Sequence, residues 1–244
     1  MPDKRIHRGP APEDERLFDR DMWPRLRQAT RDLCWLLSQG YALRSSSELV
    51  GNRHSLRTRQ RLALGRCACS DEARASRRHK EVHRAQLRNQ ELWIDGFNVL
   101  TGLEAALSGG VILAGCDGCY RDLASVHARH HQVHETTPAL WLIGTWTIEQ
   151  GLRRCVWWLD RPVSNSARLR QEMLELATAN GWDWQVELVW SPDKVLAETR
   201  EIVATSDSAI LDRCQRWVNL TRFLVADHVP GARIVDLSVG ICTA

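Results

Sequence analysis

The feature that most constrains the fold is an alternation of short β-rich runs with helical stretches, which begins near residue 89. The runs Glu91–Asp95, Arg154–Asp160 and Trp184–Val189 have the length and composition of strands. Helical segments separate them, and such spacing implies crossover connections between parallel strands. We therefore predict an α/β domain with a mainly parallel sheet over residues 89–244.

Further elements are expected between and after these runs. The predicted additional strands cover Val111–Ala114, 201–205 and 232–237. The predicted helices cover 98–107, 120–134, 138–150, 165–180, a short segment from 191, and 208–217.

The first part of the chain has a different character. We expect a flexible leader over residues 1–20 and a basic helical domain over 21–88. A helix from about residue 24 to Gly40, a short helix near 47–50, a Gly51-Asn52 turn and a basic helix resemble a helix-turn-helix arrangement. A charged helix or linker over 70–90 leads to a domain boundary near residue 88.

Charge separates these two parts. Residues 1–90 contain 20 Lys and Arg but 11 Asp and Glu, so their net charge is +9, and the remainder carries −6. A basic, arginine-rich module is the usual footprint of nucleic-acid binding, although a solvated helical surface has the same composition. The candidate nucleic-acid-binding residues are Arg53, Arg57, Arg59 and Arg61.

Aspartates stand at the ends of three predicted strands. Asp95, Asp160 and Asp207 lie far apart in sequence, but the carboxyl ends of parallel strands meet at one ligand-binding edge. Carboxylates repel one another, and a divalent cation such as Mg²⁺ or Mn²⁺ makes their proximity tolerable. These aspartates are therefore candidate metal ligands and catalytic residues; the alternative is that each only caps a helix.

Other polar groups surround the predicted site. Asp193, in the first turn of a short helix, is a possible fourth metal ligand or a favourable charge at a helix N-terminus. The candidate substrate- and phosphate-binding residues are Asn98, Arg161, Ser164, Asn165, Arg168, Thr205 and Ser206.

Two motifs carry a family resemblance. The segment WIDGFNVL (93–100) resembles the opening motif of NYN/PIN-type nuclease domains, and VATSDSAIL (203–211) is similar to their later strand ending in Thr-Ser-Asp. LDRP (159–162) and Asp193 match their central and helix-borne acids. The chain over about 22–240 also resembles an uncharacterised prokaryotic family with a helical domain fused to a PIN-like domain, through GNRHSLRTRQRLALGRCACSDE, LDRPVSNS and VATSDSAILDR.

The PIN resemblance implies a Rossmann-like sheet, an acidic Mg²⁺ or Mn²⁺ site and hydrolysis of phosphodiesters, in RNA rather than DNA. The metal would polarise the scissile phosphate and activate water, so no Cys or Ser nucleophile is required. PIN sites often contain a further acid, and Glu104, Asp117 and Asp122 all remain open for that role. If the further ligand is absent, the expected alternative is a non-catalytic RNA- or DNA-binding adaptor.

Other chemistries fit less well. Cys116-x₂-Cys119 precedes His127, His130, His131 and His134, but a second tight pair of zinc-finger spacing is lacking, and Cys67-x-Cys69 adds little; we do not expect zinc. Phe97 occupies the position where a haloacid-dehalogenase-like phosphatase has its second Asp. The acids that a Toprim-type site requires are not found in this sequence. Gly96-Phe97-Asn98 does not provide the glycine-rich turn of a dinucleotide-binding site. No P-loop, export signal or membrane-spanning run occurs, so we expect a cytoplasmic protein with reduced cysteines and no membrane partner.

Overall fold

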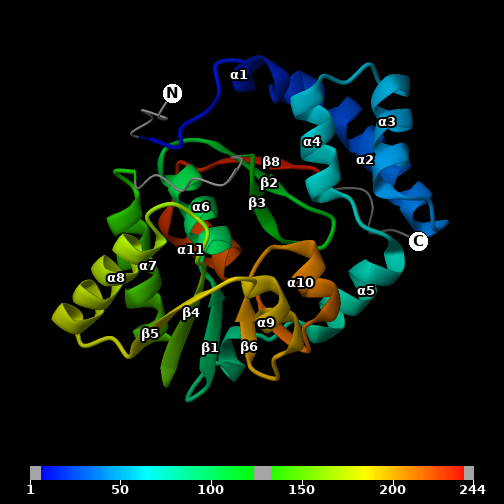
Figure 1. Cartoon of the computed structure of the whole chain (residues 1–244). Helices are drawn as coiled ribbons and strands as arrows, with labels where there is room; N and C mark the ends of the chain where they lie inside the picture. Colours follow the sequence, from blue (N-terminus) through cyan, green and yellow to red (C-terminus); the bar gives the residue numbers. More distant parts are fainter. Residues whose placement is uncertain (1–6, 124–132, 239–244) are drawn as a thin grey trace.

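The computed structural model describes residues 7–123 and 133–238, and it shows an α/β protein with a helical region before two sheets (Figure 1). The helices are α1 (Asp14–Leu17), α2 (Trp23–Ser38), α3 (Leu43–Arg53), α4 (Thr58–Cys67), α5 (Asp71–Lys80), α6 (Gly96–Leu107), α7 (Thr136–Glu149), α8 (Ser166–Asn180), α9 (Pro192–Glu198), α10 (Ser208–Arg213) and α11 (Leu220–His228). The strands are β1 (Glu91–Asp95), β2 (Val111–Ala114), β3 (Tyr120–Asp122), β4 (Arg154–Asp160), β5 (Trp184–Val189), β6 (Ile202–Ala204), β7 (Arg216–Val218) and β8 (Arg233–Asp236). No helix of the described ranges is long and apolar enough to cross a membrane.

The larger sheet is parallel throughout and has the strand order β5-β4-β1-β6-β7. This confirms the predicted α/β class. If these five strands are numbered along the chain, the order is 3-2-1-4-5, so the direction of strand addition reverses between β1 and β6. Helices make the crossovers, since neighbouring parallel strands cannot be joined by a tight turn.

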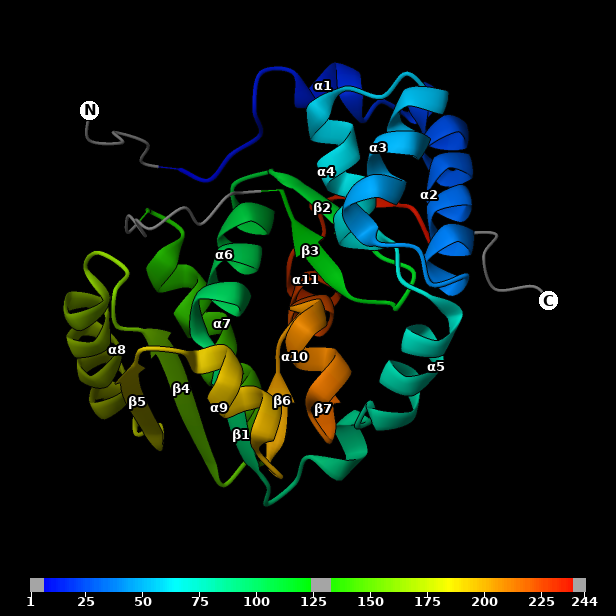
Figure 2. The same ribbon diagram turned by 45° about the vertical axis from the view of Figure 1, so that its right-hand side comes forward.

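Each face of this sheet has its own core, because successive strand residues point to opposite sides. Leu92 and Ile94 of β1 pack into the largest core cluster, to which α6, α7, α8 and α11 contribute. Trp93 packs against a smaller cluster that contains Leu196 of α9 and Ile210 of α10. Helices α9 and α10 lie next to each other beside β6 (Figure 2). Both faces of the sheet are therefore covered, as parallel sheets require.

The smaller sheet has the order β3-β2-β8, with β2 antiparallel to β3 and parallel to β8. Ile112 of β2 packs into the core that contains α6, whereas Val111 and Leu113 pack against the helical region. We expected the strands at 111–114 and 232–237 to belong to the main, mostly parallel sheet, and this expectation is wrong. The apolar pattern identifies a strand but does not specify its neighbour.

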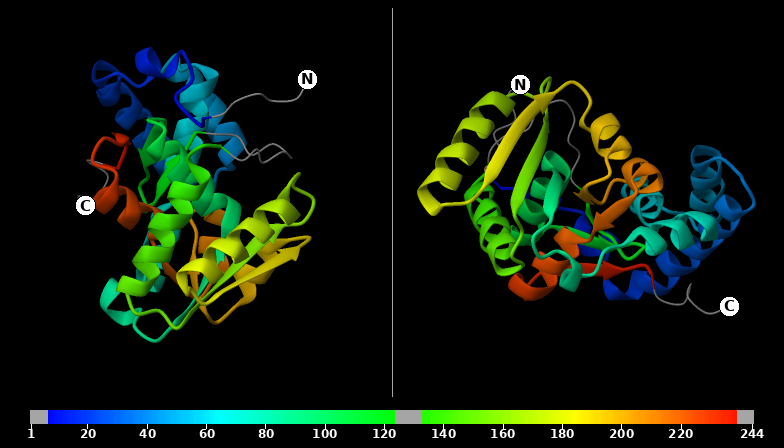
Figure 3. Two further views of the ribbon diagram at one scale, coloured as in Figure 1. Left: turned by 90° about the vertical axis from the view of Figure 1, so that its left-hand side faces the viewer. Right: turned by 90° about the horizontal axis from the view of Figure 1, so that it is seen from below.

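The N-terminal helices lie at one end of the molecule, opposite α8 (Figure 3). Leu26 and Leu33 of α2 and Leu64 of α4 share a core with the smaller sheet. Residues of the predicted leader take part as well, since Leu17 and Phe18 are buried in this core. The short helix expected near 47–50 is the longer α3.

Several predicted elements have the observed bounds, namely β1, β2, β4 and β5. The helix expected over 120–134 is wrong at its start, where β3 pairs with β2; residues 124–132 lie outside the described ranges. The helix expected over 208–217 ends at Arg213, and Trp217 lies in β7. Trp217 is fully buried and its Nε1 donates to the Arg77 carbonyl at 2.7 Å, a contact with α5 that local sequence does not reveal.

Candidate functional site

Four acidic residues lie at the edge of the larger sheet where its parallel strands end. Asp95 is the last residue of β1 and Asp160 the last residue of β4. Asp193 lies in the first turn of α9, and Asp207 precedes α10 just after β6. The strand order reverses between β1 and β6, and open parallel sheets bind ligands in the crevice at such a reversal.

Asp95 is the buried member of this group, with 7% of its surface exposed. Its Oδ2 accepts a hydrogen bond from Thr205 Oγ1 at 2.7 Å, which joins the ends of β1 and β6. Gly96 follows it because the chain turns here directly into α6: a Cβ at Gly96 would lie 2.4 Å from Leu159 Cδ2. This close packing of α6 on β4 helps to keep water from Asp95.

The segment Thr205 to Asp207 is held by several hydrogen bonds. Asn98 Oδ1 accepts from the Ser206 backbone N–H at 2.8 Å and from its Oγ at 2.9 Å. The Asp207 N–H donates to Thr205 Oγ1 at 3.0 Å. Asp207 Oδ1 accepts from the N–H groups of Ala209 and Ile210 at 2.7 and 3.3 Å. Asn98 and Ser206 therefore fix the loop, and Asp207 caps α10 with one of its two oxygens.

The four carboxylates influence one another electrostatically. Burial first, and then the Asp207, Asp193 and Asp160 carboxylates, raise the pKa of Asp95 to about 8 against the opposing Thr205 hydrogen bond. Burial and the Asp193 carboxylate raise the pKa of Asp160. Asp193 lies on the exposed side of α9, yet partial burial and the Asp207 carboxylate raise its pKa as well. The site therefore holds unbalanced negative charge.

The acids do not converge on a single point. Within the described ranges no three His, Cys, Asp or Glu side chains are arranged to hold a metal ion. The sheet register gives a reason: Asp95 pairs with Trp158, so Asp160 lies two residues further along β4. At roughly 3.3 Å per residue, this places Asp160 about 7 Å beyond Asp95 along the strand direction.

Asp95 differs from the other buried acids, which all have arginine partners. Asp14 pairs with Arg59, Glu104 with Arg8 and Asp122 with Arg66. Among the described residues, Asp95 is the one buried carboxylate that forms no ion pair.

The three acids that we considered for a further metal ligand are all paired. Glu104 also accepts from Thr136 Oγ1 at 2.5 Å. Asp117 accepts from Arg77 and Arg121, both at 2.6 Å. Although burial opposes ionisation, these guanidinium groups hold the pKa of Asp117 well below its usual range. Glu104, Asp117 and Asp122 thus already have basic partners of their own.

The loop after β4 carries the remaining predicted phosphate ligands. The Arg161 guanidinium lies 5.7 Å from the ring centroid of the exposed Trp190. Ser164 and Asn165 are exposed, and Asn165 adopts φ +66° before α8. Arg168 donates to Glu172 one turn along α8 at 2.9 Å. These residues lie on the surface beside Asp160, and their role as phosphate ligands stays a prediction.

The four arginines predicted to bind nucleic acid are placed in different ways. Arg59 Nη2 donates to Asp14 Oδ2 at 2.8 Å. Arg61 donates to the Leu56 carbonyl and to Asn52, so it stabilises the turn between α3 and α4. Arg57, just before α4, and Arg53, at the end of α3, are exposed. The guanidinium groups of Arg53 and Arg57 are therefore more accessible to a ligand than those of Arg59 and Arg61.

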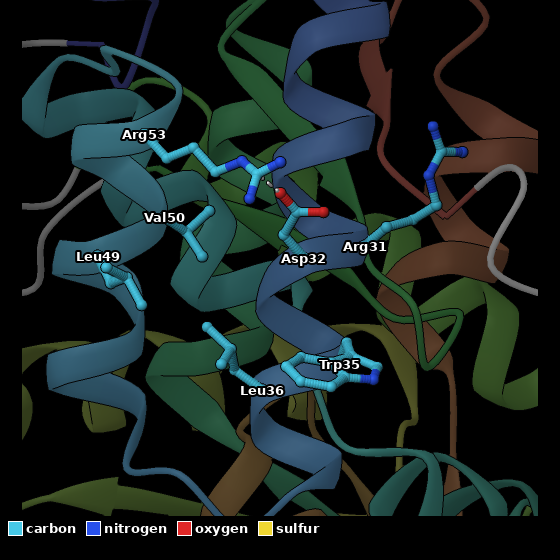
Figure 4. A pocket seen from close by; sticks show the side chains of 7 residues that line it. All are labelled: Arg31, Asp32, Trp35, Leu36, Leu49, Val50 and Arg53. Atoms are coloured by element: carbon cyan, nitrogen blue, oxygen red, sulfur yellow. Dashed lines mark ion pairs between the residues drawn. The ribbon is translucent and has the colours of Figure 1, made fainter.

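An apolar groove of about 510 Å³ lies between α2 and α3, and none of the four acids lines it (Figure 4). Leu36, Leu49 and Val50 face the space between the helices, and Arg31 and Asp32 of α2 also line the groove. Arg53 at its rim lies 3.6 Å from Asp32. Trp35 and Leu49 are large apolar residues, yet they are 62% and 60% exposed.

The two cysteines of the Cys116-x₂-Cys119 pair pack in different clusters. Cys116 packs in the core of the helical region, with its Sγ 3.6 Å from Cys34 Sγ, and Cys119 packs in the cluster with α9 and α10. Cys67 and Cys69 lie in the same core as Cys116. His127, His130 and His131 lie outside the described ranges, and the His134 ring contacts His7.

Sequence reasoning missed Arg121, which is buried in β3 and donates from Nε to the Ser206 carbonyl at 2.8 Å. The two residues are 85 positions apart, and no local pattern joins them.

Comparisons with known proteins place these features in a family. Residues 25–80 match the family described as Protein of unknown function (DUF434), and residues 84–223 match Domain of unknown function (DUF5616). The chain is 28% identical over 186 residues to "Uncharacterized protein MJ0935" of Methanocaldococcus jannaschii, covering 76% of this chain and 88% of that protein. No solved structure matches the chain. Since the second match spans more than half of the sequence, the chain belongs to the DUF5616 family, with a DUF434 region before that domain.

Proposed function

We propose that the protein is a metal-dependent ribonuclease with a PIN- or NYN-like domain, and that it hydrolyses phosphodiester bonds at the acidic edge between β1 and β6. The observation that carries this proposal is Asp95, a buried carboxylate without an ion pair among the described residues and with three other acids acting on its pKa. Burying such a group destabilises the fold unless something compensates it. An unpaired buried carboxylate at the point where the strand order reverses is therefore a candidate functional group.

The donor set suits a hard divalent cation. Asp95 and Asp207 would hold Mg²⁺ or Mn²⁺, with Asp160 and Asp193 acting through water, because Mg²⁺ usually keeps several waters and binds one or two carboxylates directly. The lack of three converging ligands among the described residues is compatible with such a hydrated ion. When bound, the cation would supply Lewis-acid activation of the phosphate and of the attacking water.

The chain's own residues have definable tasks in this reaction. Asp95 has a pKa of about 8 in the protein without metal, so near neutral pH it would release its proton when the cation binds. Thr205 Oγ1 fixes the orientation of the Asp95 carboxylate, and Asn98 fixes the adjoining loop through Ser206. Arg161 and Arg168 supply positive charge beside Asp160 for the phosphate backbone. The exposed Arg53 and Arg57 of the helical region would extend the nucleic-acid contact.

The test is cleavage of a pooled, end-labelled cellular RNA preparation by the purified full-length protein, with Mn²⁺ or with EDTA. Asp95→Asn and Asp207→Asn should each lower the cleavage rate by about a hundredfold or more. The matched control is Asp183→Asn, an exposed acid paired with Arg154 away from the site, and it should cleave normally. Cleavage that persists with EDTA, or in both site variants, would exclude this site.

A non-catalytic nucleic-acid-binding adaptor is the second candidate. The observation in its favour is that the acidic side chains of the described residues do not form a ready-made metal site. An adaptor would bind RNA or DNA in a salt-dependent way, with no cleavage and no response to Mn²⁺. The same experiment with added binding measurements at two salt concentrations distinguishes the two functions.

A further inference from the structure

Arg121 connects the smaller sheet to the loop that carries the candidate catalytic residues. It is 7% exposed, and its Nε donates to the Ser206 carbonyl at 2.8 Å. Its Nη1 and Nη2 donate to the two oxygens of Asp117 at 2.8 and 2.6 Å, and Nη2 also reaches Ser208 Oγ at 3.4 Å. The guanidinium is thus oriented by a bidentate ion pair, and its Nε–H points at the loop backbone.

The packing around Arg121 leaves a fitted space for its guanidinium. A Cβ at Gly115 would lie 2.7 Å from Arg121 Nη1 and 3.0 Å from Asp117 Oδ1. The Cys119 N–H donates to Asp117 Oδ1 at 3.2 Å, which holds the acid in the same turn. The β2–β3 turn therefore fixes the position of the guanidinium.

The contact with Ser206 is placed where it can control the site. The N–H and Oγ of Ser206 are bound by Asn98, so Arg121 completes the fixation of this residue from its carbonyl side. Ser206 lies directly between Thr205, which is bonded to Asp95, and Asp207. Because Thr205 is bonded to Asp95 and Asp207 follows Ser206, a rotation of the peptide after Ser206 would move Asp207 relative to Asp95.

We infer that Arg121 is a positioning residue for this acidic site: through the Ser206 carbonyl it sets the separation of Asp95 and Asp207, and thereby the affinity of the site for a divalent cation. The inference rests on the proposed metal-dependent function for its effect on the cation. Its effect on the loop is independent of that function. Groups that hold metal ligands in place commonly change metal affinity by tenfold or more when removed.

Arg77 provides a matched comparison. It shares Asp117 with Arg121, at 2.6 Å, but its Nε is bonded to Asp212 of α10, at 2.7 Å. It is as buried as Arg121, with 3% exposed. Arg77→Lys therefore disturbs the same buried ionic cluster without removing the hydrogen bond to Ser206.

The experiment compares Arg121→Lys and Arg77→Lys in the full chain by two measurements. Mn²⁺ binding is titrated by the electron paramagnetic resonance of the free ion, and amide hydrogen exchange is followed for the peptide covering 203–211 without metal. In Arg121→Lys we expect about tenfold weaker Mn²⁺ binding and faster exchange at the Ser206 and Asp207 amides. In Arg77→Lys we expect a lower melting temperature but a Mn²⁺ dissociation constant within about threefold of the unsubstituted protein's.

Equal losses of affinity in the two variants, or unchanged exchange and affinity in Arg121→Lys, would overturn the inference. If the unsubstituted protein does not bind Mn²⁺, the proposed function fails, while the exchange comparison still decides whether Arg121 positions the loop. Gly115→Ala is the second variant should Arg121→Lys not fold. It keeps every charge, crowds Arg121 Nη1, and should shift both measurements in the same direction as Arg121→Lys.

Discussion

Replacing Asp95 by asparagine should make the protein without metal more stable at neutral pH. The asparagine amide has the shape of the protonated carboxyl, and its oxygen can still accept the hydrogen bond from Thr205. The substitution therefore removes the charge that burial disfavours and keeps the packing around Gly96. A gain in stability at a residue that the reaction needs would be a sign of selection for function.

The magnitude follows from proton linkage. The pKa of Asp95 is about 8 in the folded protein and 3.8 for an unperturbed carboxyl. Between these values unfolding releases a proton, so the free energy of unfolding falls as the pH rises. Each pH unit contributes about 1.4 kcal/mol, so the carboxyl of Asp95 costs roughly 4 kcal/mol by pH 7 relative to pH 4. Asp95→Asn should recover most of this amount.

The assay is urea denaturation of both proteins in EDTA at half-unit steps from pH 4 to pH 8. The two unfolding free energies should be similar near pH 4 and should diverge steadily up to pH 8, with the variant more stable. Asp183→Asn, an exposed acid, should show no such divergence. Parallel pH curves for Asp95→Asn and the unsubstituted protein would refute the reasoning, because they would mean that Asp95 is ionised at little cost in the folded state.

Two further results are expected. Because a metal ligand must be deprotonated, Mn²⁺ affinity should rise by up to about tenfold per pH unit between pH 6 and 8 and level off above the pKa of Asp95; a flat profile in a calorimetric titration would contradict this. Arg59→Ala leaves the fully buried Asp14 without its ion-pair partner and should lower the free energy of unfolding by about 3–5 kcal/mol in urea, whereas a loss below about 1 kcal/mol would show that the pair is dispensable.

The parts of the fold that sequence predicted are those fixed by local pattern. The runs that form β1 and β4 are apolar and end in a single acid, so both the strands and the positions of Asp95 and Asp160 could be read directly. The three-residue β7 carries too short a pattern to separate it from the preceding helix. The pairing of β2 with β8 joins residues more than 120 positions apart, and no turn or spacing specifies it.

Within the site, the sequence predicted which polar residues lie at or near the strand ends, but not how they interact. Asn98 and Ser206 were candidates for phosphate or water binding, yet they bind each other. Binding a ligand and bonding to each other both require polar residues next to a strand end, so residue type could not distinguish these two roles. Asp207 illustrates the same ambiguity: it lies at the predicted edge and also caps α10.

The count of charges over residues 1–90 could not show which arginines are free to bind a ligand. The excess of arginine over residues 1–90 suggested a nucleic-acid surface, but Arg59, Arg66 and Arg77 are bonded to Asp14, Asp122 and Asp117 inside the protein. Two of these three acids, Asp117 and Asp122, belong to the acidic second part, so the opposite charges of the two halves neutralise each other in part where the halves meet. The other buried acids of the described residues, Asp14, Glu104 and Asp122, form ion pairs with arginines of the first 90 residues. Asp95 has no such arginine among the described residues, and this missing partner, rather than the net charge of either half, is what supports our proposal of a bound cation.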